Sequence, residues 1–216
     1  TIETLAAATA ALEQALKAGG HALHRVVLPP QPLGETVRLQ IVRFALDKVD
    51  VKGLARLDRE NVLASLPELA PGGSPNLQRM AIQGRLANLG GHKQVQVGLK
   101  ASAKPDAIDA TVDVREGSPW QWGVDLSNTG SAATGRDRLT LLGGHSNLFN
   151  RDHALSGAWT TSLQEPGDVR QWGLTYRMPL YASGGFLQAS LSRSDIVGRF
   201  GAFSSPTYTI FIGLSL

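Results

Sequence analysis

The spacing of apolar residues predicts a helix at the start of the chain. Over Thr1 to Ala18 apolar positions recur every three or four residues, and Gly19-Gly20 then ends the helix. Two short strands are expected next, His21 to Leu28 and Glu35 to Phe44, separated by a break at Pro29-Pro30. The first 43 residues are therefore expected to form a helix followed by two strands.

The next segment predicts a second, complete set of helices and strands. A strand at Leu46 to Val51 leads to a short helix with Asp58 as its N-cap, which runs to about Leu66. A longer helix from Pro75 to about Leu89 ends at a glycine pair. Two alternating strands follow, at Lys93 to Ala101 and Ala107 to Glu116. The predicted order is strand, helix, helix, strand, strand.

The rest of the chain alternates with the period of two that is typical of strands. In Trp120 to Ser127 the residues Trp120, Trp122, Val124 and Leu126 share one face, and polar or small residues share the other. About six such strands are expected, joined by turns rich in Asn, Gly, Ser and Pro, which favours an antiparallel meander. The further expected strands are Arg138 to Gly144, Ala154 to Leu163, Trp172 to Met178, Leu187 to Leu191 and Tyr208 to Leu216.

Composition divides the chain at Gly117. All six Lys and only one aromatic residue, Phe44, precede this point, whereas all four Trp follow it. The 216 residues include no Cys, which excludes disulfides and thiolate sites. The net charge of +3 has no basic run that could follow a phosphate backbone, so no nucleic acid partner is expected. No stretch reaches the roughly 18 apolar residues of a membrane helix, so any membrane-spanning part must use strands.

The residues between the apolar positions favour a membrane barrel over a soluble sandwich. A sandwich has a charged outer face, but here the second face is mostly Gly, Ser, Thr, Gln and Ala, as in a barrel lumen. Aromatic residues also lie near strand ends, where an interfacial girdle would place them. Closed barrels need at least about eight strands, and six leave two unpaired edges. We therefore expect that the chain is a piece of a longer protein or that its edges pair elsewhere.

Several motifs together resemble two-partner-secretion outer-membrane transporters, the haemolysin activation/secretion (TpsB) family. Asn128-Thr-Gly-Ser131, Thr134-Gly135 and Asn147-Leu-Phe-Asn-Arg-Asp152 resemble the first barrel hairpin of that family. Leu28-Pro-Pro-Gln31, Leu33 and Val37 to Val42 resemble the end of its first polypeptide-transport-associated (POTRA) module. Val51-Lys-Gly53 and Pro75-Asn76 resemble parts of its second module. The resemblance implies three parts: the end of a first POTRA module at 1–43, a second POTRA module at 44–117, and the first barrel strands at 118–216.

The sequence also departs from this family. The first module lacks its opening strand, and nothing matches the Arg-Gly motif of the inward-folded loop that members use for secretion. The family barrel has about sixteen strands, whereas about six are expected here. The fold class is therefore α+β POTRA modules followed by part of an antiparallel transmembrane barrel.

The resemblance implies two sets of functional residues. An extended client chain can add to the free edge of a POTRA sheet while apolar side chains in the helix-strand groove give selectivity. The expected client-binding residues are Leu77, Met80, Val95, Val97 and Leu99, with a role in the core as the alternative. The residues expected to face the barrel lumen are Arg136, Arg138, Arg177 and Arg193, with charges at strand ends as the alternative.

These features together predict an outer-membrane translocator of a Gram-negative bacterium, with its POTRA part in the periplasm. It would capture an unfolded secreted exoprotein and export it through a lipid-embedded barrel, with no catalytic residue, metal or cofactor. The alternatives are an assembly factor that inserts other barrels and a soluble periplasmic all-β binding protein. The oligomeric state and the client's identity stay open.

Three motifs of enzymes and metal sites have plainer interpretations. Gly144-His-Ser-Asn-Leu148 begins like a lipase nucleophile elbow but leads into a strand. Gly130 to Asp137 has glycines like a phosphate loop but no Lys and no following helix. His21 and His24 have no third metal ligand near them in the sequence. A hairpin segment, a loop and ordinary strand residues are expected instead.

Overall fold

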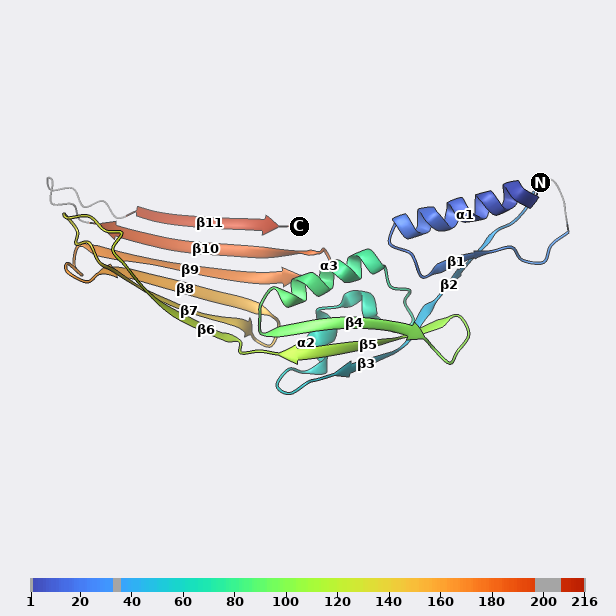
Figure 1. The fold of residues 1–216 in the computed structure, drawn as a ribbon, viewed down its shortest axis with the longest axis horizontal. Helices are drawn as coiled ribbons and strands as arrows, with labels where there is room; N and C mark the ends of the chain where they lie inside the picture. Colours follow the sequence, from blue (N-terminus) through green and yellow to red (C-terminus); the bar gives the residue numbers. More distant parts are fainter. Residues whose placement is uncertain (1, 33–35, 197–206, 216) are drawn as a thin grey trace. The chain divides into compact units, whose positions relative to one another are not determined.

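The computed structural model describes residues 2–32, 36–196 and 207–215. The chain forms two compact units. The first unit contains Thr1–Ala87 and Gln94–Arg115, and the second contains Asn88–Lys93 and Glu116–Leu216. Figure 1 shows helices and strands in the first half of the sequence and a series of adjacent strands in the second half.

The first unit begins with α1 (Ile2–Ala18), as predicted. The helix ends because Gly20 adopts a φ of 84°, and Gly20 N and His21 N donate to Lys17 O and Leu16 O. These two bonds form a Schellman motif. The strands β1 (His24–Val27) and β2 (Gln40–Arg43) follow as an antiparallel pair. Both strands are shorter than the sequence pattern predicts.

A side chain explains why the predicted strand from Glu35 to Phe44 is shorter in the structure. Leu33, Gly34 and Glu35 lie outside the described residues, and 36–39 are not in a strand. Gln31 Nε2 donates to Arg38 O at 2.9 Å, and Arg38 N donates to Gln31 Oε1 at 2.9 Å. The amide side chain of Gln31 therefore occupies both backbone groups of Arg38, and strand pairing begins only at Gln40.

The remaining elements of the first unit follow the predicted order. They are β3 (Ala45–Lys52), α2 (Arg59–Ala64), the 3-10 helix η1 (Pro67–Leu69), α3 (Leu77–Asn88), β4 (Lys93–Ala101) and β5 (Ala107–Glu116). The sheet has the order β3-β5-β4, with β3 parallel to β5. Buried side chains of this part of the chain include Leu46, Ile108 and Val112 on the sheet and Val62 and Leu66 in the helical segment between β3 and α3.

Two polar residues mark the starts of these helices. Asp58 occupies the predicted N-cap position of α2, but its side chain makes no capping hydrogen bond. Asn76 caps α3 instead of lying inside it, because its Oδ1 accepts from Gln78 N and Arg79 N, each at 3.1 Å. Asn76 Nδ2 also donates to Gly19 O at 2.8 Å, which joins the start of α3 to the end of α1.

The second unit contains one six-stranded antiparallel sheet (Figure 1). Its strands are β6 (Trp120–Ser127), β7 (Arg138–Leu148), β8 (His153–Ser162), β9 (Val169–Leu180), β10 (Gly185–Ile196) and β11 (Thr207–Ser215). Each strand pairs with its neighbours in the sequence, so the predicted meander of six strands is confirmed. In the described part of the chain β6 and β11 are the two edges, and the sheet is not closed.

The apolar face of this sheet is exposed. Trp122 is 85% exposed, and Val124 and Leu126 are also exposed. No second sheet packs on the described strands of this unit, so the arrangement lacks the paired sheets of a sandwich. Separately, none of the described helices is both long and apolar enough to span a membrane.

Candidate functional site

One edge of the three-stranded sheet is closed by the protein's own groups. Leu46 N donates to Gly73 O at 2.7 Å, and Gly72 N donates to Leu46 O at 2.8 Å. Arg59 Nη2 donates to Val49 O at 3.1 Å. A sheet edge is available for a further strand only where its backbone groups are unpaired. Strand β3 is therefore a poor acceptor for an additional strand.

The other edge of the same sheet is β4. In the order β3-β5-β4, no described strand lies on the outer side of β4. The residues predicted to bind the client lie on β4 and α3 with different burial. Val95 is 7% exposed and belongs to the core, whereas Val97, Leu99, Leu77 and Met80 are half-buried. The half-buried residues are thus the ones of this set that an added strand could still contact.

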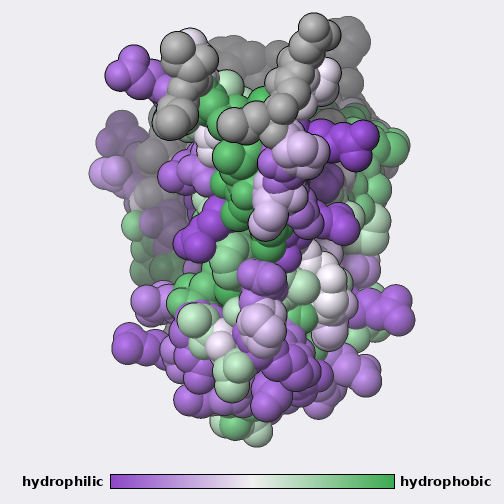
Figure 2. Space-filling model, turned by 90° about the vertical axis from the view of Figure 1, so that its right-hand side faces the viewer, coloured by the Kyte–Doolittle hydropathy of each residue, from purple (hydrophilic) through white to green (hydrophobic). Residues whose placement is uncertain are grey.

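The first unit also exposes large apolar side chains elsewhere. Leu28, Val37 and Ile41 are each more than one third exposed. Figure 2 shows a mainly hydrophilic face of the molecule that is interrupted by hydrophobic patches.

The strand register separates the six-stranded sheet into two chemically different faces. One row across all six strands is polar, and the adjacent row on the other face is largely apolar. The polar row is Asp125, Thr140, Thr160, Gln171, Ser194 and Thr207; the apolar row is Val124, Leu141, Trp159, Trp172, Arg193 and Tyr208.

Polar side chains on neighbouring strands form hydrogen bonds with one another on the polar face. Thr140 Oγ1 and Thr160 Oγ1 lie 2.9 Å apart, and Gln171 Nε2 donates to Ser194 Oγ at 2.8 Å. Thr175 Oγ1 and Ser190 Oγ lie 3.0 Å apart. Because hydroxyl and amide groups retain further hydrogen-bonding capacity, this face can remain hydrated or contact a polar chain.

The four arginines predicted to face a lumen have different positions. Arg136 is exposed in the loop before β7. Arg138 lies on the polar face of β7, but its guanidinium binds Gly135 O at 2.8 Å and Thr134 Oγ1 at 2.8 Å. The guanidinium of Arg138 therefore stabilises the loop that precedes β7. Arg177 lies on the polar face, opposite Gln188 in register.

Arg193 lies on a different face of the sheet from Arg177. Arg193 pairs in register with Trp172 and Tyr208, so it lies on the apolar face, opposite to that of Arg177. Its Nε lies 2.8 Å from Asp195 Oδ2, and its guanidinium lies 5.0 Å from the Tyr208 ring centroid. Arg177 and Arg193 thus cannot face one common interior, because side chains on consecutive positions of a strand alternate between faces.

A buried ionic cluster occupies the second unit. We call His92, Lys93, Asp152 and Tyr181 the Asp152 cluster. The carboxylate of Asp152 lies 2.9 Å from His92 Nε2 and 2.7 Å from Lys93 Nζ, and it accepts from Tyr181 Oη at 2.6 Å. Lys93 is 0% exposed. The cluster joins residues 88–93 to the β7–β8 and β9–β10 turns.

Burial and pairing shift the titration of this cluster. Burial raises the pKa of Asp152, but the hydrogen bond from His92 and the charge and hydrogen bond of Lys93 outweigh it and lower the pKa to about 2. Burial lowers the pKa of Lys93 despite the charge of Asp152, and burial beside the same carboxylate raises the pKa of Tyr181. The carboxylate of Asp152 therefore stays charged near neutral pH.

Backbone geometry places Asp152 in this cluster. Phe149, Asn150 and Asp152 all have positive φ angles, and Asp152 N donates to Asn147 Oδ1 at 3.0 Å. Non-glycine residues rarely adopt this region, and Asn and Asp tolerate it best. The sequence Asn147-Leu-Phe-Asn-Arg-Asp152 thus forms a tight turn that directs a carboxylate toward Lys93. Sequence reasoning identified this motif but missed its partners: His92 and Lys93 are 60 and 59 residues away, and Tyr181 is 29 residues away.

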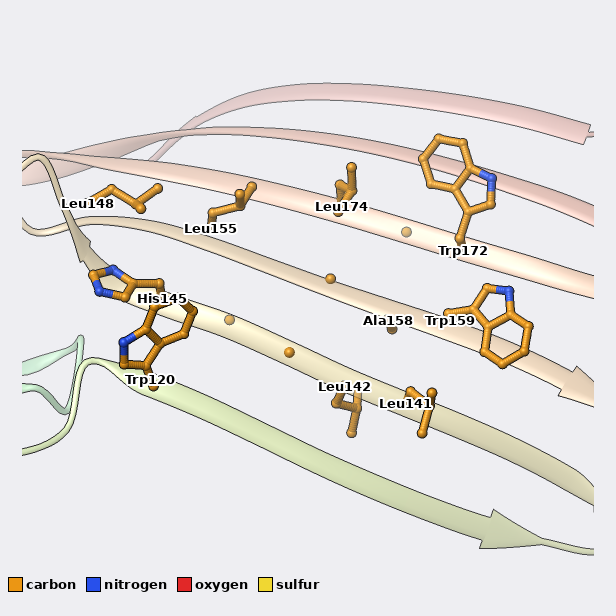
Figure 3. Close-up of a pocket in the computed structure, with 14 residues that line it drawn as sticks. Trp120, Leu141, Leu142, His145, Leu148, Leu155, Ala158, Trp159, Trp172 and Leu174 are labelled. Carbon is orange, nitrogen blue, oxygen red and sulfur yellow. The ribbon is translucent and has the colours of Figure 1, made fainter.

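The apolar face also has a shallow depression (Figure 3). Its volume is about 750 Å³. Gly143 and Gly157 pair in register at its base, and Leu141, Trp159 and Trp172 line one side. Figure 3 shows Trp120 and His145 together at the other end, where their ring centroids lie 4.7 Å apart. Its lining is almost wholly apolar, with His145 as the titratable residue among the lining side chains.

The enzyme-like and metal-like motifs gain no support from their surroundings. Ser146 is buried, and its Oγ donates to Pro119 O at 3.2 Å. His145 Nδ1 accepts from Asn147 N at 3.2 Å. The rings of His21 and His24 lie 5.0 Å apart, and no cluster of three ligating side chains occurs among the described residues.

Comparison with known proteins reveals similarity only at the level of structure. The sequence matches no protein-family profile and no curated protein. CdiB from Escherichia coli, a TpsB transporter, is similar with a TM-score of 0.75 and 18% identity over 99% of this chain and 41% of that chain. CdiB from Acinetobacter baumannii has a TM-score of 0.66 and 17% identity over 85% of this chain and 34% of that chain.

A third solved structure shares the fold less closely. BamA from Haemophilus ducreyi lacking POTRA domains 1–3 has a TM-score of 0.53 and 16% identity over 98% of this chain and 41% of that chain. The resemblance seen in the sequence is thus borne out at the level of fold. The chain has the fold of part of a TpsB-type two-partner-secretion transporter and spans 41% of the length of the Escherichia coli CdiB chain.

Proposed function

We propose that the chain is part of an outer-membrane polypeptide translocator. Residues 1–43 form the end of a first POTRA module and residues 44–117 form a second one, both in the periplasm, and residues 118–216 supply barrel strands. The observation that carries this proposal is the six-stranded sheet with one exposed apolar face and one polar face. A membrane barrel needs this division, because lipid contacts one face and water or a client contacts the other.

Client capture is assigned to the β4 edge. An unfolded exoprotein presents backbone N–H and C=O groups along its whole length, and an open strand edge can bind them without a fixed sequence. The contacts that close the β3 edge support β4 as the acceptor. Leu77, Met80, Val97 and Leu99 then offer apolar contacts beside the added strand, while Val95 supports the core.

We assign the passage of the client chain through the barrel to the polar face of the six-stranded sheet. Hydroxyl and amide side chains there offer weak, replaceable hydrogen bonds to an extended chain. Arg138 and Arg177 both lie on this face, but the guanidinium of Arg138 binds its own loop, whereas that of Arg177 forms no hydrogen bond or ion pair with the described residues. The partners are an unfolded secreted exoprotein and outer-membrane lipid, and the proposed chemistry uses no cofactor.

Site-specific photo-crosslinking in the full-length transporter tests the capture step. A photoreactive residue at Gln96 on β4 is expected to crosslink to the client during export. The matched control is Lys48 on β3, which is also exposed and lies on the closed edge. Equal crosslinking from Lys48 and Gln96 would contradict capture by the β4 edge.

A second pair of positions tests the two faces of the sheet. A photoreactive residue at Thr175 on the polar face is expected to crosslink to the client, and one at Leu174 on the apolar face is expected to crosslink to lipid. Both residues lie in β9, so the pair differs in the face but not in the strand. Client crosslinks from Leu174 alone would reverse the assignment of the faces.

A further inference from the structure

A second pocket lies on the polar face of the six-stranded sheet. Its volume is about 250 Å³, and all of its lining residues belong to the second unit. Two rows of the register form its floor: Gln121, Ser156 and Thr175 in one, and Ala154, Arg177 and Gln188 in the next. The lining also includes Leu89, Gly90, His145, Ser146 and Leu155. Unlike the depression on the apolar face, this pocket is lined mainly by polar groups.

Arg177 is the charged group of this pocket. Its neighbours in register are Ala154 and Gln188, so neither adjacent strand places a carboxylate beside it. The lining contains no Asp or Glu. Within the described chain no hydrogen bond or ion pair engages its guanidinium, which instead lies 5.6 Å from the ring centroid of Phe186.

These surroundings leave Arg177 suited to bind an anion. The Phe186 ring lies against the guanidinium and limits its positions, and the planar group presents several N–H donors in a fixed arrangement. The short side chain of Ala154 leaves space on one side of it, and the amide of Gln188 supplies a further donor on the other side. A guanidinium with adjacent neutral donors is the usual recognition site for a carboxylate.

The other strand arginines lack this arrangement. Arg138 uses its guanidinium to hold Thr134 and Gly135. Arg193 pairs with Asp195 on the apolar face. The guanidinium of Arg177 therefore differs from theirs in having no hydrogen-bond or ion-pair partner among the described residues.

We propose that the Arg177 pocket binds the carboxylate of an Asp or Glu side chain in an extended peptide that lies along the polar face. The pocket volume suits one side chain with its backbone, not a folded domain. Gln121, Ser156 and Thr175 then bind the adjacent peptide groups. The peptide's identity as an exported client rests on the proposed function, but recognition of the carboxylate does not.

Peptide binding to the full-length protein in detergent micelles tests this proposal. The probes are two fluorescently labelled peptides with blocked ends, Ser-Gly-Asp-Gly-Ser and Ser-Gly-Asn-Gly-Ser, followed by fluorescence anisotropy. The Asp peptide is expected to bind at least about tenfold more tightly than the Asn peptide. Arg177→Gln is expected to remove this preference by weakening only the binding of the Asp peptide.

Arg170→Gln is the matched control. Arg170 lies in the same strand but on the opposite face, in register with Asp195, so its removal is expected to leave both affinities unchanged. Circular dichroism checks that each variant is folded. If Arg177→Gln fails to fold, Arg177→Lys replaces it, and a preference reduced several-fold is expected because the charge stays but the planar donor arrangement is lost.

Three results would overturn the proposal. The first is equal binding of the Asp and Asn peptides, and the second is an equal loss of preference in Arg170→Gln. The third is displacement of the Asp peptide by inorganic phosphate at a concentration no higher than the concentration of acetate that displaces it. The last result would indicate a general anion site.

Export is measured separately from peptide binding. If peptide preference holds but no client is exported, the proposed function fails while this inference stands. If export proceeds without peptide preference, the inference alone fails.

Discussion

Lys93 Nζ lies 2.7 Å from Asp152 Oδ2, and both side chains are buried. The two residues are 59 positions apart in the sequence. Asp152 also receives hydrogen bonds from His92 and Tyr181, so one carboxylate joins three separate segments of the second unit. His92 has a buried Nδ1 without a hydrogen-bond partner, and a Cβ atom at Gly90 would lie 2.6 Å from it. The packing around this cluster is therefore tight.

Asp152→Asn is expected to destabilise the protein by about 3–5 kcal/mol. The substitution leaves the ammonium of Lys93 buried without its charged partner. Urea unfolding in micelles measures the loss, and Asp125→Asn on the exposed polar face is the control, expected within about 0.5 kcal/mol of the parent protein. Adding Lys93→Met to Asp152→Asn is expected to restore part of the stability because it removes the unpaired charge. A double variant that is less stable than Asp152→Asn would contradict this explanation.

The stability is expected to fall in acid because of Asp152. Its pKa is about 2 in the folded protein, below the ordinary value of 3.8. A lowered pKa means that the charged form favours folding: the contribution is complete above about pH 4 and is lost as the pH falls toward 2. Unfolding midpoints between pH 6 and pH 2 measure this loss. If Asp152→Asn shows the same acid dependence as the parent protein, another carboxylate is responsible.

Gly20→Ala is expected to destabilise the first unit by about 1–2 kcal/mol. Gly20 has a φ of 84°, and a Cβ atom there would lie 2.2 Å from Asn76 Oδ1. Thermal unfolding followed by circular dichroism measures the effect. The adjacent Gly19→Ala serves as the control, since its Cβ atom would have no neighbour nearer than 3.5 Å. Similar losses in both variants would argue against a special conformation at Gly20.

Gln31→Ala is expected to increase amide exchange at Arg38. The substitution removes the side chain that binds both backbone groups of Arg38, each at 2.9 Å, at a cost of about 1–2 kcal/mol. Hydrogen exchange followed by NMR or mass spectrometry measures the change. Gln14→Ala on the exposed side of α1 is the control, and exchange at Arg38 should not respond to it.

Val124→Arg is expected to destabilise the protein in lipid vesicles by about 2–4 kcal/mol. Val124 lies on the apolar face, and a charge there would face hydrocarbon. Asp125→Arg places the same side chain on the polar face of the same strand and should cost much less. Denaturant unfolding in vesicles compares the two variants, and equal costs would mean that the apolar face does not contact lipid.

Local sequence patterns determined most of the secondary structure. The bounds of β4, β5 and β6 match the alternating segments exactly as predicted, because the period of two is a property of each strand alone. The glycine pair after α1 likewise predicted its end. The pattern failed at 36–39, where a side chain from outside the segment occupies the backbone of Arg38.

The candidate sites depended much more on the tertiary structure. The sequence alone predicted an apolar and a polar face for the strands of 118–216, and most described residues lie on the predicted face. Arg193 lies on the apolar face despite its charge, because its face is decided by its register against Trp172 and Tyr208.

The sequence by itself determined the order of the elements, the two-faced strands and the resemblance to a transporter family, since each depends on residues close together in the chain. The tertiary structure alone decided which sheet edge is closed, that Lys93 meets Asp152, and that Arg177 lies beside Phe186 and Ala154. These relationships join residues on separate elements. Strand register and turn geometry fix them, and neither has a signature within a single segment of sequence.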